Sequence, residues 1–567
     1  MKKFITNPWI ISIIINTVVL LAVMLLTDTA YETNDDYVIS LRIADGYPYS
    51  SFVNYFLCRM LIGIQSMLPG INVFTVMQIF ASWVSFVCIT RVFMDTMKNR
   101  GVLTVAFFIM TVFAADHYSI LQFTRTSALM LTCGMLLLIH SMIQRKGFGW
   151  YIMAFALIYP GTWMRDMNLI VAIGSAGIFL VAWVIINRRE LIPEGYLKPK
   201  RILIYAVCLL LLGGAAGTSL LTTHINNSTE ELAEFSDYDY YRSLATDYPV
   251  YEDYEKNRED YETAGISEND LYLISNWYLD YNGAASGENL KKINEIYKSH
   301  GGETESVTAA VKEAVSGCLD DVKDFNRRGM HLIIIGLLLI AGIIAYKPRY
   351  LPYLFGTCLF AGVLYLYLFY VGRPLYRATY IADIGTIVWM LYYFDSRYLR
   401  KREVGSGALR AAAGLCIIAL VACQAPVIKA SKQLHSYGVN NCISEEMADF
   451  IKDNEENFYV FGKGTRGLSE YYATPLRVPE EGYQKNALGF GSWGTKSPYI
   501  LDKLEAYGLE NTFEDLIDND KAFLFEDKNV SRLTEYMNKW YGDSFGEIYP
   551  EKAGEVDGHS MWRMRSR

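Results

Sequence analysis

The stretch Ile10–Leu26, IISIIINTVVLLAVMLL, decides the fold. It contains no charged residue and is long enough to cross the hydrocarbon core of a bilayer as a helix. Met-Lys-Lys opens the chain, and no Ala-x-Ala cleavage pattern closes the apolar run. We therefore expect an uncleaved first membrane span.

The whole chain has the same apolar character. Over 567 residues it is 52% hydrophobic and 20% charged, with a net charge of -8 and a mean hydropathy of +0.15. These values exclude a disordered chain and a collagen-like fibre, and they argue against an ordinary soluble enzyme and a nucleic-acid binder. The nine cysteines form no CxxC pair and no Cys/His cluster, so we expect neither a structural zinc site nor a disulfide scaffold.

Further apolar runs predict eleven membrane spans in all. The segment Ser51–Leu68 is also apolar, but Arg59 and two flanking prolines interrupt it, so we interpret it as an amphipathic helix at the membrane surface. The runs 102–115 and 331–346 are short for a span. The eleven predicted spans are 9–27, 72–93, 102–115, 119–140, 149–164, 167–187, 202–221, 331–346, 350–371, 379–395 and 409–428.

The distribution of basic residues predicts the sidedness of these spans. If the N-terminus is cytoplasmic, the inner segments hold 18 Lys and Arg residues, whereas the short outer loops hold 5. The odd number of spans then places the C-terminus outside. We expect a multi-pass protein of the plasma membrane, in a bacterial cell, with a first outer loop at 28–71 and a large outer loop at 222–330.

Two outer segments are long enough to fold outside the bilayer. The large loop 222–330 is acidic and rich in tyrosine, and the tail 429–567 follows the last predicted span. In the tail, Phe458–Phe461 and Ala522–Phe525 are predicted strands, while Ser444–Lys452 and Asn529–Trp540 are predicted helices. The sequence thus predicts a mostly α-helical membrane domain over 1–428 and a small extracytoplasmic α/β domain over 429–567.

The chemistry is expected among ionisable residues near the outer membrane face. The chain has no P-loop, HExxH or GxSxG motif, so an ATP-driven pump and several hydrolase classes are disfavoured. The first outer loop contains Asp35 and Asp36 in the string TNDDY (33–37). Two adjacent carboxylates can supply a general base. The alternative is a solvated acidic loop or a cap for a helix over 37–45.

At this point the chain resembles the GT-C glycosyltransferases. The resemblance lies in the acidic pair of the first outer loop, the surface helix, the eleven spans and the outer C-terminal domain. Protein O-mannosyltransferases, aminoarabinose transferases and O-antigen glucosyltransferase-type proteins belong to this group. The segments 34–36, 54–71, 266–280 and Gly372–Arg377 are similar more narrowly to uncharacterised bacterial members near surface-polysaccharide genes.

The resemblance implies a GT-C-like fold and transfer of a sugar from a polyprenyl-phosphate-linked donor to an extracytoplasmic surface glycan. Asp35 or Asp36 is then the catalytic base. Arginines suit the leaving lipid phosphate because their planar guanidinium binds two oxygens while staying charged. The candidates for substrate binding are Arg373, Arg377, Arg165, Arg125, Asp116 and His117.

Three of these candidates have plain structural alternatives. Arg125 lies within a predicted span, where a charge calls for a partner, and Asp116 is a nearby acid. Asp116 and His117 together make a poor metal site without further ligands, so a helix cap or hydrogen-bonded turn is the alternative. No cofactor is assigned, and whether a divalent metal takes part stays open.

Two other signals are discounted. Asp237-Tyr238-Asp239 matches the DxD string of nucleotide-sugar transferases, but it lies in an outer loop, away from cytoplasmic nucleotide sugars. Most of the tyrosines between Tyr238 and Tyr281 are expected to pack this loop.

Three further functions remain alternatives. The first is an O-antigen polymerase or ligase, which is disfavoured because the large loop is net acidic. The second is a lipid-linked sugar flippase or transporter, which is disfavoured because no internal repeat is visible. The third is an inactive scaffold of the same family.

Overall fold

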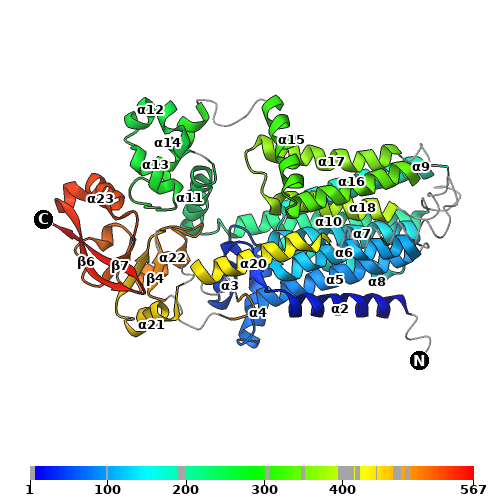
Figure 1. Cartoon of the computed structure of the whole chain (residues 1–567), viewed down its shortest axis with the longest axis horizontal. Helices are drawn as coiled ribbons and strands as arrows, with labels where there is room; N and C mark the ends of the chain where they lie inside the picture. The colour runs from blue at the N-terminus through cyan, green and yellow to red at the C-terminus, as the bar shows by residue number, and fades with distance from the viewer. Residues whose placement is uncertain are drawn as a thin grey trace. The chain divides into compact units, whose positions relative to one another are not determined.

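The computed structural model describes residues 7–97, 100–189, 196, 198–248, 250–299, 307–345, 351–393, 414, 422–441, 443–463, 474–478 and 485–567. The chain folds into two compact units, which interleave in sequence. The bundle unit comprises Met1–Thr222 and Glu305–Ser436, and the sheet unit comprises Thr223–Thr304 and Tyr437–Arg567. The prediction of a mostly α-helical protein with a small α/β domain is confirmed (Figure 1).

Long apolar helices form the bundle unit, and ten of the eleven predicted spans coincide with one of them. The eleventh, 409–428, lies mostly outside the described residues. In the part of the chain that the structure describes, seven of these helices (α2, α5, α6, α7, α9, α10 and α16) are long and apolar enough to cross a membrane. The chain is therefore a multi-pass membrane protein. The helices are α2 (Pro8–Leu26), α5 (Val73–Thr96), α6 (Arg100–Ser119), α7 (Phe123–Gln144), α8 (Phe148–Met164), α9 (Met167–Asn187), α10 (Pro199–Ile225), α16 (Arg327–Ala345), α17 (Leu351–Tyr370) and α18 (Tyr376–Tyr393).

The two runs that seemed short for a span belong to longer helices. The run 102–115 lies in α6, which has 20 residues, and 331–346 overlaps α16, which has 19. Asp116 is therefore in the last turn of α6 and not in a loop, and Arg327 is the first residue of α16. The ranges predicted from hydropathy are too short because the ends of both helices carry charged residues. These charged residues are paired in the fold.

Helix α7 is at the centre of the bundle. It packs against α5, α8, α9 and α18, and most of its side chains are buried. Glycines bring α7 and α8 close together: a Cβ at Gly134 would lie 3.0 Å from the Ala154 carbonyl oxygen, and one at Gly161 would lie 3.0 Å from Leu131. Small residues at such contacts are typical of packed membrane helices.

The first outer loop folds against the end of the bundle. It contains helices α3 (Asn34–Ala44) and α4 (Tyr55–Met67). The two-residue strands β1 (Ala30–Tyr31) and β2 (Ile120–Leu121) pair in parallel, which ties this loop to the turn between α6 and α7. Helix α4 buries one face and exposes apolar residues on another, as a surface helix would, while its position in the membrane stays a prediction.

The sheet unit combines the tail with most of the large outer loop. Its five-stranded sheet has the order β4-β3-β5-β7-β6, with β3 parallel to β4 and β5 and with β7 antiparallel to β5 and β6. Side chains from both segments share one hydrophobic core. The elements are α11 (Glu230–Thr246), η1 (Tyr251–Lys256), α12 (Arg258–Thr263), α13 (Glu268–Ser275), α14 (Gly287–Ser299), α21 (Glu445–Asp453), β3 (Phe458–Phe461), β4 (Ala487–Gly489), α22 (Pro498–Glu505), η4 (Glu514–Leu516), β5 (Ala522–Phe525), α23 (Val530–Phe545), β6 (Ile548–Val556) and β7 (His559–Ser566). Helix α20 (Gln424–Asn441) carries the chain from one unit to the other.

Buried carboxylates join the loop segment 266–285 to the tail. Asp280 is 1% exposed and accepts hydrogen bonds from the Tyr536 and Tyr541 hydroxyls at 2.9 and 2.6 Å and from the Asn511 amide at 3.0 Å. Asp270 accepts hydrogen bonds from the Lys539 ammonium group and from the Trp540 indole. These two carboxylates therefore have structural contacts in this part of the chain.

We expect Asp280→Ala to destabilise the sheet unit. The substitution leaves three buried donors without their acceptor, and each costs about 1–3 kcal/mol. The measurement is the protease susceptibility and the thermal midpoint of the full chain in detergent. Asp543→Ala, which removes an exposed carboxylate from α23, is the control. If the two variants unfold at the same temperature, the Asp280 contacts do not hold the loop to the tail.

Candidate active site

The charged candidates gather at one end of the bundle unit. Asp116 is in the last turn of α6, Arg125 in the first turn of α7 and Arg377 in the first turn of α18, while Arg165 separates α8 from α9. Arg125 therefore lies at the end of its helix and not deep in a span, as the predicted segment 119–140 implied. The candidates divide into two sets with different exposure and charge.

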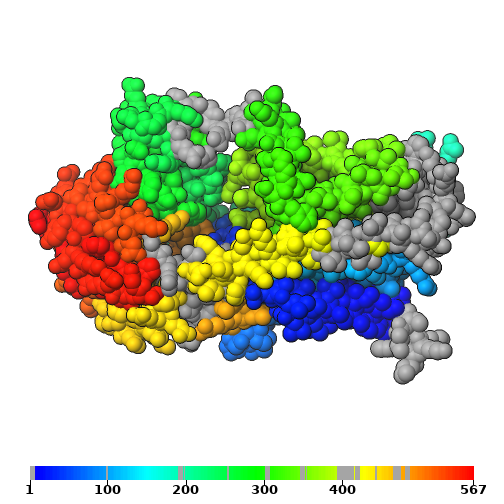
Figure 2. Space-filling view, viewed as in Figure 1, coloured from blue at the N-terminus to red at the C-terminus, as the bar shows by residue number. Residues whose placement is uncertain are grey.

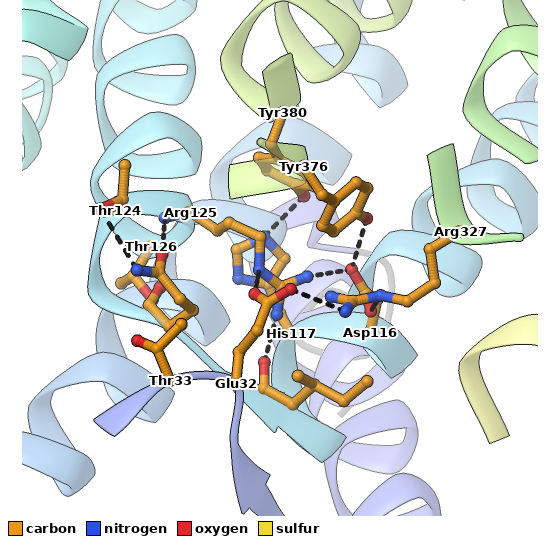
Figure 3. Close-up of polar contacts among 12 residues, drawn as sticks. Glu32, Thr33, Asp116, His117, Thr124, Arg125, Thr126, Arg327, Tyr376 and Tyr380 are labelled. Carbon is orange, nitrogen blue, oxygen red and sulfur yellow. Dashed lines mark hydrogen bonds and ion pairs between the residues drawn. The ribbon is translucent and has the colours of Figure 1, made fainter. Parts of the chain in front are cut away.

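The first set is a closed group of two carboxylates and two guanidiniums, which we call the ion-pair cluster (Figure 3). Arg125 pairs with Asp116, and its Nε lies 3.0 Å from Glu32 Oε2. Arg327 donates to Asp116 Oδ1 at 2.8 Å and to Glu32 Oε1 at 2.9 Å. Asp116 and Arg125 are fully buried. The cluster is neutral, so its four charges satisfy one another.

Tyrosines of α18 complete the surroundings of the ion-pair cluster. The Tyr376 hydroxyl donates to Asp116 Oδ2 at 3.0 Å, and the Arg327 guanidinium lies 4.3 Å from the centre of the Tyr376 ring. Behind Tyr376, His331 Nδ1 lies 3.1 Å from the Asp383 carboxylate, and both residues are fully buried. This network fixes the first turn of α18.

His117 is a buried hydrogen-bonding residue in this structure. Its Nε2 lies 2.6 Å from the Tyr380 hydroxyl, and its Nδ1 lies 3.3 Å from the Ser82 hydroxyl. Both ring nitrogens thus have protein partners. In the described part of the chain, no group of three or more His, Cys, Asp or Glu side chains is placed to hold a metal ion.

The two adjacent aspartates have different environments. Both lie in the first turn of α3, which begins at Asn34, so the helix starts earlier than predicted. Consecutive residues of a helix point about 100° apart. Asp36 points inward, where it is fully buried and accepts hydrogen bonds from Gln78 Nε2 at 3.1 Å and from the Phe123 amide at 2.8 Å. The Asp35 side chain is 15% exposed.

Burial raises the pKa of the Asp36 carboxyl well above its ordinary value, and the adjacent Asp35 charge adds to the rise. The hydrogen bonds from Phe123 and Gln78 oppose this shift without cancelling it. Asp36 therefore holds its proton to higher pH than an exposed aspartate does.

The second set surrounds Asp35 with arginines. Arg377 Nη2 lies 3.9 Å from Asp35 Oδ2. The pKa of Arg165 is lowered by burial and by the charges of Arg377 and Arg373, while Asp166 and Asp35 oppose the shift. We call Arg165, Arg373 and Arg377 the arginine set. Its three positive charges face two carboxylates, so this part of the site has one more positive charge than negative charges.

The loop that carries Arg373 and Arg377 is held at both ends. Gly372 has φ +67°, a backbone conformation that favours glycine. Arg328 Nη1 donates to the Pro374 carbonyl at 2.6 Å, and Tyr376 is bound to Asp116. The arginine set is thus positioned by contacts outside itself.

Both members of the pairs Asp116–Arg125 and Asp35–Arg377 were candidates from the sequence, but several of their partners were not predicted. The structure brings Asp35, Arg165, Arg373 and Arg377 into electrostatic range, and it joins Arg125 to Asp116 as the structural alternative predicted. Glu32, Arg327 and Tyr376 were not proposed. The signal that could have found Arg327 is its position at a span boundary, directly before an apolar run.

No protein-family model and no curated protein matches the chain. A solved structure to which it is similar is the crystal structure of ArnT from Cupriavidus metallidurans in the apo state. The match has 11% sequence identity and covers 98% of this chain and 97% of that chain, with a TM-score of 0.40. A likeness of this degree does not identify site residues or a substrate.

We expect Asp116→Asn to destabilise the bundle unit more than Glu32→Gln does. Asp116 is fully buried and contacts both arginines and Tyr376, whereas the Glu32 side chain is 15% exposed. Breaking a buried ion pair costs about 3–5 kcal/mol because the remaining charge is left unpaired. The measurement is the thermal midpoint in detergent, with Arg59→Gln on the exposed face of α4 as the control. Equal midpoints for all three variants would contradict the structural role of the cluster.

We expect the stability contributed by Asp36 to fall as pH rises. Its folded-state pKa is raised, so the folded chain keeps a proton that the unfolded chain loses above about pH 4. This contribution is present at low pH and is lost as pH passes through the folded pKa. Asp36→Asn removes it, so the thermal midpoint of the variant should rise relative to wild type as pH increases. Asp28→Asn, an exposed carboxylate of the same loop, is the control, and parallel pH profiles for Asp36→Asn and wild type would refute the assignment.

Proposed function

We propose that the chain is a membrane glycosyltransferase of GT-C type. It would move a sugar from a polyprenyl-phosphate-linked donor to an extracytoplasmic surface glycan. The observation that carries the proposal is the 3.9 Å separation of the Asp35 carboxylate and the Arg377 guanidinium, with Arg165 and Arg373 in electrostatic range. A candidate base and a candidate phosphate site therefore lie together at one end of a membrane bundle.

Asp35 is the proposed general base, and Asp36 is not. A base must reach the acceptor hydroxyl, and of the two carboxylates Asp35 is the one with exposed surface. As the acceptor oxygen attacks the anomeric carbon, its proton passes to Asp35. The bond from the anomeric carbon to the phosphate oxygen breaks, and its electron pair leaves with the lipid phosphate. Asp36 anchors α3 through Gln78 and the Phe123 amide.

The arginine set is the proposed site for the donor phosphate. A lipid phosphate is a weak base, so charge stabilisation matters more for its departure than protonation does. The extra positive charge of this set is suited to an anion, and guanidinium groups bind phosphate oxygens in pairs. The ion-pair cluster is neutral and buried, so Arg125 and Arg327 are assigned a supporting role.

Aromatic side chains beside Arg165 support an amphipathic ligand. The Arg165 guanidinium lies 5.7 Å from the centre of the Phe52 ring, and the Phe56 and Trp163 rings are 6.2 Å apart in the same region. All three rings are partly exposed. A lipid-linked phosphate needs such an apolar surface next to its anion site. No residue is assigned to a metal, and the proposed setting is the outer face of a bacterial plasma membrane with the N-terminus inside.

The test compares the surface glycans of cells that carry wild type, Asp35→Asn or Asp36→Asn at equal protein levels. We expect Asp35→Asn to lower the modification by about 10²–10⁴-fold, because a general base contributes that much. Asp36→Asn preserves the shape of a residue that does not touch the substrate and should retain most of the activity.

One result would count against this function, and another would count against the roles assigned to the two carboxylates. Full glycan modification by Asp35→Asn excludes Asp35 as the base and favours a polymerase, ligase or transporter. If Asp36→Asn alone loses the modification while it folds normally, then Asp36 is the base and Asp35 is not. The thermal midpoint of each purified variant separates loss of activity from loss of fold.

A further inference from the structure

Helix α15 (Val307–Lys323) is amphipathic, and part of its apolar surface is exposed. Ala310, Ala314 and Cys318 face the bundle, and the last two pack beside Phe369 and Ala382. Figure 2 shows that the segment of α15 lies at the surface, and the stripe next to these residues is exposed. It consists of Val307, Val311, Val315 and Leu319, which are 63%, 42%, 55% and 54% exposed.

The spacing of this stripe makes it one continuous face. Its members recur every four residues, so they lie above one another on the helix. Polar side chains flank them on the other side, among them Lys312, Ser316 and Asp320. Four adjacent large apolar side chains on one helix form a patch, and such patches mark an interaction site.

The packing partner of α15 sets the level of the stripe relative to the membrane. Helix α15 contacts the end of α17, where a Cβ on Gly317 would lie 2.9 Å from the Phe369 ring. Phe369 belongs to the apolar stretch Leu354–Tyr370, one residue from its end. Gly317 of α15 is therefore level with the end of an apolar helix of the bundle. On that same end of α17, Val363 and Tyr367 are 57% and 58% exposed.

The direction of α15 agrees with a helix that lies along a membrane surface. Figure 1 shows that it runs at a steep angle to α16 and α17, which belong to the same unit. Only the residues 324–326 separate α15 from α16, a candidate membrane span. An amphipathic helix of this kind, joined directly to a span, is typical of an interfacial helix.

We propose that the stripe Val307, Val311, Val315 and Leu319 lies in the headgroup boundary of the bilayer, so that α15 is a second interfacial helix besides α4. The occupant of the apolar face is lipid. The apolar surface of α15 continues that of α17, and the polar residues of α15 then face water. This assignment is independent of the proposed transferase activity.

Lipid contact at α15 has a consequence for the charged site. The turn after α15 leads into Arg327, a member of the ion-pair cluster, and Arg328, which holds the Pro374 carbonyl. Arg328 also pairs with Asp321 in the last turn of α15. An interfacial α15 therefore fixes the depth of these arginines relative to the membrane surface.

The experiment uses the full chain in phosphatidylcholine nanodiscs. Val315→Cys and Ser316→Cys place a thiol on the stripe and, one residue away, on the polar face. A hydrophilic maleimide should modify Val315→Cys about tenfold more slowly than Ser316→Cys, because a side chain on the stripe prefers the apolar phase to water, where the reagent is. After labelling with an environment-sensitive fluorophore, the Val315 conjugate should emit at shorter wavelength and lose intensity when the lipids carry brominated chains. The wild-type chain gives the background from its own cysteines.

Two results overturn the proposal. Equal modification rates and equal emission at both positions place the stripe in water. A slow rate at Val315 without quenching by brominated lipid, together with a disulfide between two copies, assigns the face to a second protein chain. Because Val315 and Ser316 are both exposed, neither substitution is expected to disturb the fold, and matching thermal midpoints check this point.

Discussion

The ion-pair cluster of Glu32, Asp116, Arg125 and Arg327 is the constraint on which the charged end of the bundle depends. Each charge comes from a different element: the loop after β1, α6, α7 and α16. Burying charge in an apolar bundle is unfavourable unless every charge is paired. In the observed arrangement of the four elements, each of these charges has a partner of opposite sign. The parallel β1–β2 pair holds the loop and the α6–α7 turn in the same register.

This arrangement separates a neutral set of charges from a set with net positive charge. The ion-pair cluster is neutral and mostly buried, whereas the arginine set around Asp35 has excess positive charge and partial exposure. The same separation occurs between Asp35 and Asp36. A helix turns the two side chains about 100° apart, so one faces Gln78 and the other faces Arg377. Adjacent identical residues thus have different chemistry because of the helix that carries them.

Much of the fold could be predicted because its signals are local. Hydropathy located ten helices of the bundle, and β-rich runs located Phe458–Phe461 and Ala522–Phe525 as strands. The limits of α6 and α16 could not be predicted, since their terminal charges look like loop residues until their partners are known. Glu32 and Arg327 are 295 residues apart, and no periodicity relates them. The candidate site was partly predictable, because Asp35 and Arg377 were both expected at the outer membrane face.

Arg327 and Arg328 show why the two charged sets depend on each other. These adjacent residues begin α16 and point to different partners: Arg327 joins Glu32 to Asp116, and Arg328 holds the Pro374 carbonyl beside Arg373. A shift of α16 would therefore disturb the ion-pair cluster and displace the loop that carries the arginine set. Tyr376 adds a second link, since its hydroxyl reaches Asp116 while the next residue, Arg377, reaches Asp35. The buried neutral cluster thus determines where the exposed positive charge lies, although it provides none of that charge itself.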